Sequence, residues 1–481
     1  MGPKVLLIDP RGWQGAVSGN RAFPNVGIAY LASSLKSHGC QVSVIDLNNT
    51  LKTDGQVLSE ILQFQPDIIG FSSKTATIKD SRNIANQLKD FKNTFTVVVG
   101  GAHTASSWQS LIREGCFDAV FVGEGEEGFA QACLKIKSKE SLEGIEGLIT
   151  KNPQGKDISV SCALIQDLDL IRFPDYDDFP EIVKRAISAT YPLVTSRGCV
   201  YKCTYCSVPE ISGKKFRPRS PQNIIDELEY ARTKYGIRSF EIIDDVFNLD
   251  IERCKEICRQ LLKADLGLNW SCPNGLRADR VDKELAQLMY QSGCRSVMVG
   301  IESADPKILE SVKKAESLKD IEKGIITFKD AGINVGGYFI IGLPGDSFRS
   351  VERSARFARR LKIPALFNML VPYPGTELWE WAMANARFLY DIEDGLHFAD
   401  LSQKVKPVIE TDDFSGKERQ RAYEMAHTLT GNFNMLVPPQ ITHWRRDLRI
   451  LSFLFKFAPI DAFLFLGSLL KQGIKKTLGK K

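Results

Sequence analysis

Three cysteines, Cys199, Cys203 and Cys206, stand close together with the spacing C-x3-C-x2-C. Thiolates at this spacing can bind three irons of a four-iron, four-sulfur (4Fe-4S) cluster. No fourth cysteine lies nearby in the sequence, so one iron would keep an open position for a small molecule. The triplet therefore predicts an iron–sulfur cluster that can bind and activate a ligand.

Two other interpretations of the triplet are three ordinary loop cysteines and a zinc site that lacks one ligand. Zinc sites usually have four ligands that come in closely spaced pairs. The five histidines that could complete such a site are all distant in sequence: His38, His103, His397, His427 and His443. We therefore favour the cluster.

The triplet, with the aromatic Tyr205 directly before its third cysteine, resembles the motif of radical S-adenosylmethionine (SAM) enzymes. The resemblance implies that the amino and carboxylate groups of SAM chelate the open iron. It also implies that one electron from the cluster cleaves SAM to a 5′-deoxyadenosyl radical, and that a flavodoxin or ferredoxin supplies electrons.

Residues 190–400 alternate short apolar runs with helical patterns, as the barrel of such an enzyme would. Six such units predict a partial (βα)6 barrel of the TIM type, whose chemistry lies at the carboxyl ends of the strands. The expected strands are residues 192–195, 239–243, 269–271, 296–300, 335–341 and 365–371.

Polar or glycine-rich segments follow these expected strands, where the resemblance implies contacts to SAM. The SAM-binding candidates are Tyr205, Asp244, Asp245, Arg277, Glu302, Ser303, Gly342, Leu343 and Pro344. The guanidinium of Arg277 could pair with the carboxylate of SAM in a fork geometry. Each segment taken alone also has a structural explanation, since Gly-Leu-Pro-Gly is a good turn and Glu302 could pair with a surface lysine.

The first 150 residues show a second alternation of strands and helices, which predicts a doubly wound parallel sheet. The expected strands are residues 5–8, 42–45, 68–71, 97–99 and 119–122. Ligands of such sheets bind at the carboxyl ends of the strands. Small and hydroxyl residues follow three of these strands, although glycines are common in such turns for structural reasons alone.

A sheet of this kind ahead of a radical SAM motif resembles the cobalamin-binding radical SAM family, which has a Rossmann-like N-terminal domain. The resemblance implies cobalamin contacts at Ser72, Ser73, Thr75, Gly100, Gly101, Gly123 and Glu124. The first loop, Asp9–Gly15, lacks the histidine of the D-x-H-x-x-G motif with which many cobalamin proteins ligate cobalt. The ligand below cobalt, and whether cobalamin is retained, stay open.

Length and composition fit a protein of several domains. The chain has 481 residues, too many for one simple core, and an odd number of cysteines, eleven, which fits a reducing cytoplasm better than a disulfide framework. Its net charge is +5, but residues 441–481 contribute +7, so the charge of the body gives no support to a nucleic-acid groove there. No apolar run is long and uninterrupted enough to predict a membrane span.

The sequence thus divides into segments of different character. We expect a cobalamin-binding Rossmann-like domain at 1–150, a linker at 151–189, the radical SAM barrel at 190–400, a helical extension at 401–440 and a basic amphipathic tail at 441–481. The aromatic, lysine-rich tail predicts a cytoplasmic protein that touches the inner face of the membrane. The alternative is a helix packed on the barrel or on a second subunit.

The resemblance implies an enzyme that methylates an unactivated carbon of a small hydrophobic or lipid-like substrate through the deoxyadenosyl radical. A first alternative keeps the cofactors but performs oxidative cyclisation, hydroxylation or ring rearrangement, as in the anaerobic porphyrin-cyclase branch. A second alternative is a non-catalytic iron–sulfur protein that binds membranes. The sequence identifies no further catalytic residue.

Overall fold

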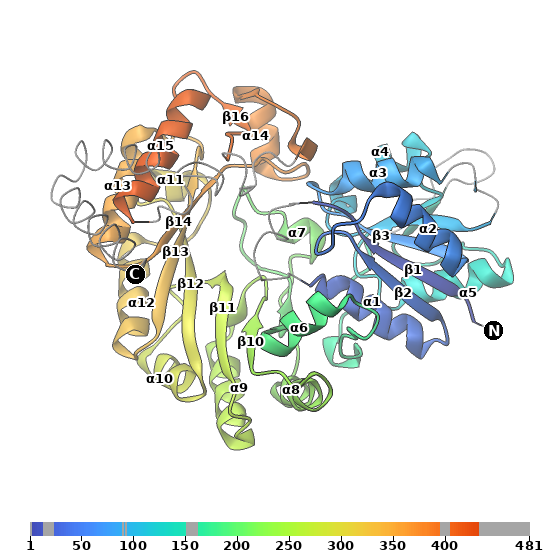
Figure 1. Cartoon of the computed structure of the whole chain (residues 1–481). Helices are drawn as coiled ribbons and strands as arrows, with labels where there is room; N and C mark the ends of the chain where they lie inside the picture. The colour runs from blue at the N-terminus through green and yellow to red at the C-terminus, as the bar shows by residue number, and fades with distance from the viewer. Residues whose placement is uncertain are drawn as a thin grey trace, which may run out of the picture.

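The computed structural model describes residues 2–12, 24–88, 91, 94–150, 162–394 and 405–431. Two α/β units lie side by side, an N-terminal unit and a larger central unit with a C-terminal extension (Figure 1). The predicted tail at 441–481 lies outside the described residues, as do the end of the first loop and the first part of the predicted linker.

The N-terminal sheet has six strands in the order β2-β1-β3-β4-β5-β6. They are β1 (Lys4–Asp9), β2 (Gln41–Asp46), β3 (Ile68–Ser72), β4 (Thr96–Gly100), β5 (Ala119–Phe121) and β6 (Leu148–Thr150). The first five are parallel and match the predicted strands. The sequence did not predict β6, a three-residue strand antiparallel to β5 that is too short for a clear periodic pattern.

Alternation along the strands buries both faces of this sheet. Val5 and Leu7 of β1 join one hydrophobic core, and Leu6 and Ile8 join the other, because successive side chains of a strand point to opposite faces. Helices α1 (Val26–Ser37) and α5 (Gly128–Ser138) cover the first face; α2 (Asp54–Phe64), α3 (Ile78–Gln87) and α4 (Thr104–Glu114) cover the second (Figure 1). The prediction of a doubly wound sheet is confirmed.

The central sheet has six parallel strands in the order β14-β13-β12-β11-β10-β7. They are β7 (Tyr191–Leu193), β10 (Ser239–Ile242), β11 (Asn269–Leu276), β12 (Cys294–Glu302), β13 (Asn334–Ile341) and β14 (Ala365–Met369). All six predicted strands are present, so the partial barrel is confirmed. Strand β11 is longer than predicted, because it continues past residue 271 to Leu276.

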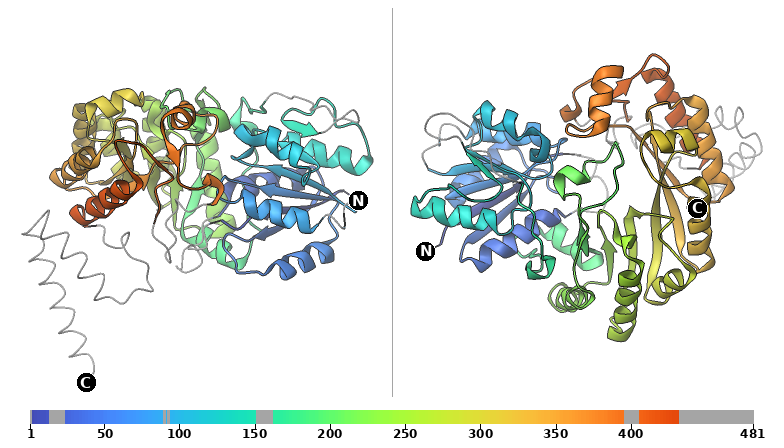
Figure 2. Two further views of the ribbon diagram at one scale, coloured as in Figure 1. Left: turned by 90° about the horizontal axis from the view of Figure 1, so that it is seen from above. Right: turned by 180° about the vertical axis from the view of Figure 1, so that it is seen from behind.

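Helices cover the outer side of the barrel sheet, as Figures 1 and 2 show. They are α6 (Glu181–Ala189), α8 (Pro221–Tyr235), α9 (Ile251–Ala264), α10 (Lys283–Gln291), α12 (Leu318–Asp330) and α13 (Phe348–Arg360). Polar caps begin several of them: Ser220 caps α8 and Asp250 caps α9 by accepting a backbone N–H in the first turn.

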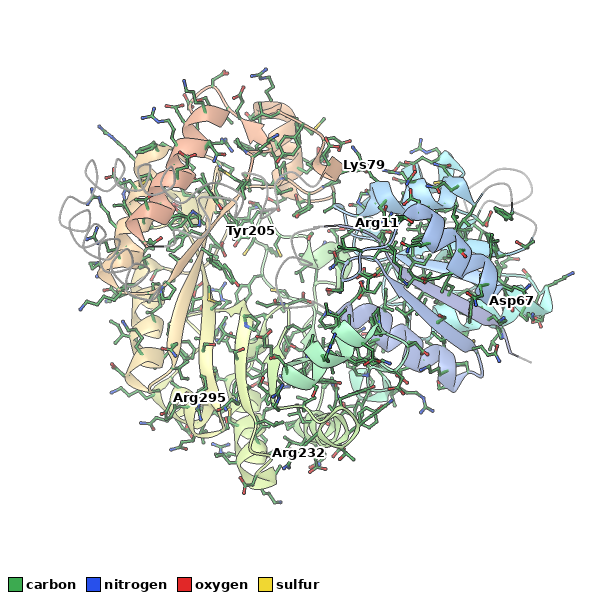
Figure 3. All side chains as sticks on the ribbon, viewed as in Figure 1. Arg11, Asp67, Lys79, Tyr205, Arg232 and Arg295 are labelled. Carbon is green, nitrogen blue, oxygen red and sulfur yellow. The ribbon has the colours of Figure 1, made fainter. Side chains whose placement is uncertain are left out.

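The chain beyond the barrel returns toward the N-terminal unit. It forms α14 (Glu377–Asn385), the short pair β15 (Arg387–Phe388) and β16 (Ile409–Glu410), and α15 (Gly416–Leu429), which packs on α13 and β14. Between β15 and β16 the 3-10 turn η5 (Ile392–Asp394) meets Lys79 of α3, labelled in Figure 3. Within the described ranges, no helix combines the length and the apolar character needed to cross a bilayer.

Candidate active site

The cysteine loop begins where β7 ends. The two-residue strands β8 (Ser196–Arg197) and β9 (Arg217–Pro218) pair across its base. Gly198, just before Cys199, has φ of +84°, and a Cβ there would lie 2.2 Å from the carbonyl oxygen of Lys215, so only glycine fits. The far side of the loop is held by the Thr204 N–H, which donates to the carbonyl of Val312 at 3.1 Å.

Cys199, Cys203 and Cys206 are half-buried free thiols close enough to influence one another. Burial, together with the charges of the other two cysteines, raises the pKa of Cys206 to about 12. Three clustered thiolates therefore need a bound cation to stabilise them. In the part of the chain that the structure describes, no three ligating side chains converge as a single metal ion would require. Three thiolates can each bind a different iron, so this donor set fits a 4Fe-4S cluster.

Asp244 and Asp245 follow β10 and hold the base of this loop. The Asp244 carboxylate is buried and accepts the Thr195 N–H at 2.6 Å and the Ser196 hydroxyl at 2.6 Å. Asp245 accepts the Gly198 N–H at 2.8 Å. Burial raises the pKa of both carboxyls, and these hydrogen bonds oppose that rise. Whether either aspartate also reaches SAM stays a prediction.

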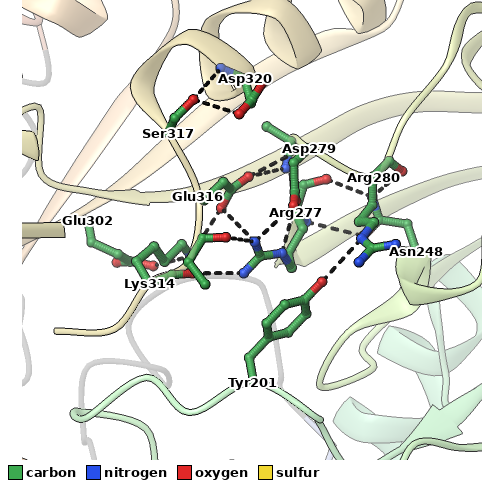
Figure 4. Close-up of polar contacts among 12 residues, drawn as sticks. Tyr201, Asn248, Arg277, Asp279, Arg280, Glu302, Lys314, Glu316, Ser317 and Asp320 are labelled. Carbon is green, nitrogen blue, oxygen red and sulfur yellow. Dashed lines mark hydrogen bonds and ion pairs between the residues drawn. The ribbon is translucent and has the colours of Figure 1, made fainter. Parts of the chain in front are cut away.

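Arg277 follows β11 and lies next to Tyr201 of the cysteine loop (Figure 4). Its guanidinium forms a fork with Asp279, with donor–acceptor distances of 2.9 and 3.0 Å. It also donates to the carbonyls of Lys314 at 3.0 Å and Ala315 at 2.7 Å. The ring of Tyr201, within the loop, lies 3.7 Å from the guanidinium carbon.

Glu302 ends β12 with a left-handed φ of +64°, uncommon for a non-glycine residue. Its carboxylate accepts a hydrogen bond from the Lys314 ammonium at 3.0 Å, and both side chains are buried. Burial alone would lower the pKa of Lys314, but the charges of Glu302 and Glu316 raise it. The neighbouring Ser303 is buried, and its hydroxyl accepts the Asp305 N–H at 3.2 Å.

The segment Gly342–Pro344 forms a tight turn after β13. Gly342 has φ of +102°, and its N–H donates to Asp346 at 2.7 Å while its carbonyl accepts from Arg419 of α15 at 3.3 Å. Leu343 is buried in a small hydrophobic core against which Tyr205 also packs. The turn and the cysteine loop therefore share one packing unit, although a contact of either with SAM stays a prediction.

A cavity of about 320 Å3 lies at the carboxyl end of the N-terminal sheet and reaches the barrel. Five of the predicted cobalamin-contacting residues line it: Ser72, Gly100, Gly101, Gly123 and Glu124. Two do not. Ser73 is buried with its hydroxyl 2.8 Å from that of Ser81, and the Thr75 hydroxyl lies 3.2 Å from Nδ1 of His103.

The cavity has apolar walls and a charged edge. Leu7, Val98, Phe121 and Phe129 contribute to its walls, and Arg197 and Asp245 belong to its barrel side. A Cβ on Gly100 would touch its nearest neighbour at 3.6 Å, so this glycine leaves room without strain. The structure thus brings the two sets of predicted residues to one boundary between the domains.

Ion pairs at this boundary join the predicted residue Glu124 and its neighbour Glu126 to two arginines that the sequence did not single out. Glu124 accepts both Nη atoms of Arg217 at 2.7 Å, and Arg197 donates to Glu126 at 2.6 Å. Arg197 also lies over the ring of Tyr30, 5.2 Å from its centroid. All these charges are largely buried. The partners are up to 93 residues apart in sequence, so only the fold reveals them.

Comparison with known proteins identifies both units. A family model of the radical SAM superfamily matches residues 193–358, and one of the B12 binding domain matches residues 16–132. An uncharacterized methyltransferase of Pyrococcus horikoshii is 34% identical over 365 residues, which is 75% of this chain and 79% of the relative. The chain belongs to the radical SAM superfamily. The cofactor set predicted from the resemblance, a 4Fe-4S cluster, SAM and cobalamin, is confirmed at the level of this family.

Other relatives of this radical SAM protein act in different ways. The cytidylyl-2-hydroxyethylphosphonate methyltransferase of Streptomyces wedmorensis is 28% identical, covering 78% of this chain and 80% of the relative. The anaerobic magnesium-protoporphyrin IX monomethyl ester cyclase of Rubrivivax gelatinosus is 26% identical, covering 78% and 69%. The radical SAM methyltransferase TsrM of Kitasatospora setae superposes with a TM-score of 0.70 at 18% identity, covering 91% and 90% of the two chains, which shows a shared fold. The prediction of an enzyme is confirmed.

Proposed function

We propose that this protein is a cobalamin-dependent radical SAM methyltransferase that acts on an unactivated carbon of a small hydrophobic substrate. One observation carries the proposal: the N-terminal cavity and the cysteine loop share a wall. Arg197 and Asp245 both line the cavity. Arg197 belongs to the segment that leads into Cys199 and donates to Glu126, and Asp245 accepts the Gly198 N–H of the same segment. A cofactor in the cavity and a cluster on the loop would therefore be neighbours.

The residues fit the two absent groups. Cys199, Cys203 and Cys206 would hold the cluster, and the apolar cavity at the carboxyl ends of the strands would take the nucleotide end of cobalamin. When bound, these groups would supply the electron that cleaves SAM and the methyl group that is transferred. The chain's own part is to hold the cysteine loop through Asp244 and Asp245, to place the buried Lys314 charge near Cys203, and to exclude water.

The experiment is anaerobic incubation of the reconstituted full-length protein with SAM, a reductant and lipid extracts, with mass spectrometry of all products. Methyl transfer should release both S-adenosylhomocysteine and 5′-deoxyadenosine together with a substrate heavier by one methyl group. A cyclase-like outcome, which the Rubrivivax relative supports as the second candidate, would release only 5′-deoxyadenosine. Release of neither product would contradict both candidates.

We further propose that residues 441–481 contact anionic membranes, with a ferredoxin or flavodoxin as electron donor from the cytoplasmic side. The support is compositional: nine basic and two acidic residues among many aromatic and leucine side chains. Truncation after residue 440 should leave the protein folded and abolish co-sedimentation with phosphatidylglycerol vesicles at low salt. Unchanged co-sedimentation, or loss of folding without any vesicle binding by the full chain, would refute the tether.

A further inference from the structure

Tyr201 is placed within the cysteine loop, two residues after Cys199 and two before Cys203. Its ring stacks on Arg277, with the guanidinium carbon 3.7 Å from the ring centroid, and its hydroxyl lies 3.2 Å from the Arg280 Nε donor (Figure 4). A guanidinium on an aromatic face is attracted by the ring quadrupole, and more strongly when water is excluded. The loop is therefore fastened to the barrel at its midpoint.

Arg277 has little capacity left for a ligand. Two of its nitrogens form the fork with Asp279, and its Nη atoms also donate to the carbonyls of Lys314 and Ala315. A guanidinium has five N–H donors, most of which are already used here. The ring of Tyr201 covers one face of the Arg277 guanidinium. The carboxylate of SAM would have to displace these contacts, so the structure favours a different role for Arg277 from the one the sequence suggested.

The turn that Arg277 binds is strained. Lys313 and Ala315, on either side of Lys314, have φ values of +54° and +52°, and Glu302, the partner of Lys314, has φ of +64°. Non-glycine residues adopt this region at a cost and do so when surrounding contacts impose it, often at functional sites. Here the imposing contacts include the hydrogen bonds from Arg277 to the two carbonyls of the turn.

We propose that Tyr201 and Arg277 are positioning residues that fix the cysteine loop relative to the buried Lys314–Glu302 pair. One guanidinium holds the loop through the ring of Tyr201 and the strained turn through two backbone carbonyls. With the base of the loop held by Asp244 and Asp245, this contact then fixes the middle of the loop, and with it a bound cluster, relative to the Lys314 ammonium. The inference deepens the proposed function and rests on it.

The test compares Tyr201→Phe, which keeps the stacked ring, with Tyr201→Leu, which removes it. Tyr290→Leu is the matched control, because Arg295 lies over Tyr290 at 5.1 Å, well away from the cysteine loop. Each full-length protein is reconstituted anaerobically, and two quantities are measured: the rate of iron loss to a chelator and the change in the electron paramagnetic resonance spectrum of the reduced cluster when SAM is added. Arg277→Lys, which keeps the charge but loses the planar fork, is measured alongside.

We expect Tyr201→Leu and Arg277→Lys to lose iron roughly tenfold faster than the wild type, a factor equivalent to about 1.4 kcal/mol, and to show a weakened spectral response to SAM. Tyr201→Phe and Tyr290→Leu should match the wild type. Tyr201→Leu with wild-type iron retention and spectral response would overturn the proposal. So would equal losses in Tyr201→Phe and Tyr201→Leu, because the hydroxyl rather than the ring would then be responsible. Failure of the wild type to assemble a cluster would instead contradict the proposed function.

Discussion

Asp9, at the carboxyl end of β1, shows how strongly the fold changes the chemistry of a single residue. It is buried near Asp46, and burial together with that neighbouring charge raises its pKa to about 7, although Lys74 and a 2.8 Å hydrogen bond from Asn25 oppose the rise. The native state therefore binds a proton at Asp9 that the unfolded chain releases near pH 4.

Because of this proton, Asp9 should make the protein less stable as pH rises from about 4 to about 7. Asp9→Asn should remove this loss of stability. Relative to the wild type, the free energy of unfolding of the variant should be roughly 1–4 kcal/mol higher at pH 8 than at pH 5. Urea unfolding of the variant and the wild type at both pH values gives the difference. Asp67→Asn is the control, because hydrogen bonds from Lys137 and the Lys4 backbone outweigh burial and lower the pKa of Asp67. An identical pH dependence in Asp9→Asn and the wild type would contradict the assignment.

Residue spacing predicted the local motif and not its distant partners. The cysteine triplet lies within eight residues of sequence, so its chemistry can be recognised from the sequence alone. Lys314 follows Lys313 and reads as part of a charged surface, yet it is buried against Glu302. Arg197 pairs with Glu126, 71 residues away, which no local pattern indicates.

At the scale of elements, parallel strands position the site because their carboxyl ends lie at the same edge of the sheet. The parallel strands β3, β4 and β5 bring Ser72, Gly100 and Gly123 to one cavity, as parallel topology requires. The sequence correctly predicted where the loops after these strands would lie. Which side chains face the cavity was not predictable, because Ser73 turns into the core to meet Ser81.

Two adjacent glycines at the end of β4 have different roles: Gly101 is required by backbone packing, and Gly100 leaves room for a ligand. Gly101 has φ of +95°, and a Cβ there would lie 2.6 Å from the Ser73 carbonyl oxygen, so Gly101→Ala should cost roughly 1–3 kcal/mol or more. Gly100→Ala adds a methyl group that meets only ordinary contacts, so stability should change by less than ~1 kcal/mol while cobalamin uptake falls. Denaturant midpoints and cobalamin per chain after gel filtration measure the two effects. Equal destabilisation by both variants, or full cobalamin uptake by Gly100→Ala, would refute this division of roles.

At the scale of the whole molecule, several groups of ion pairs join the N-terminal domain to the rest, and two of them differ clearly in burial. One is the buried group of Arg197, Arg217, Glu124 and Glu126 beside the cysteine loop. The other lies at the outer edge, where Lys79 contacts Asp394 of the C-terminal extension (Figure 3). We expect the first group to fix the N-terminal cavity relative to the cysteine loop, since Arg197 lines the cavity and directly precedes Gly198 and Cys199 in sequence.

A double-mutant cycle on Arg197→Met and Glu126→Gln tests the buried contact. Its coupling free energy should be on the order of 2 kcal/mol, because neither charge can be solvated when its partner is removed. The exposed pair Arg360–Glu322 is the control and should give roughly 0.2–1 kcal/mol. Urea unfolding of the four proteins in each cycle supplies the values. Equal coupling in the two pairs would show that the buried pair does not join the domains.

The central claim is that Cys199, Cys203 and Cys206 carry a cluster that cleaves SAM. Its most direct test is the amount of 5′-deoxyadenosine formed when the anaerobically reconstituted protein is incubated with SAM and a one-electron reductant. The wild type and a Cys162→Ser control should form it, since Cys162 lies outside the triplet. The triple alanine variant should bind no cluster iron and form none. Formation of 5′-deoxyadenosine by the triple variant, or its absence from an iron-loaded wild type, would contradict the account.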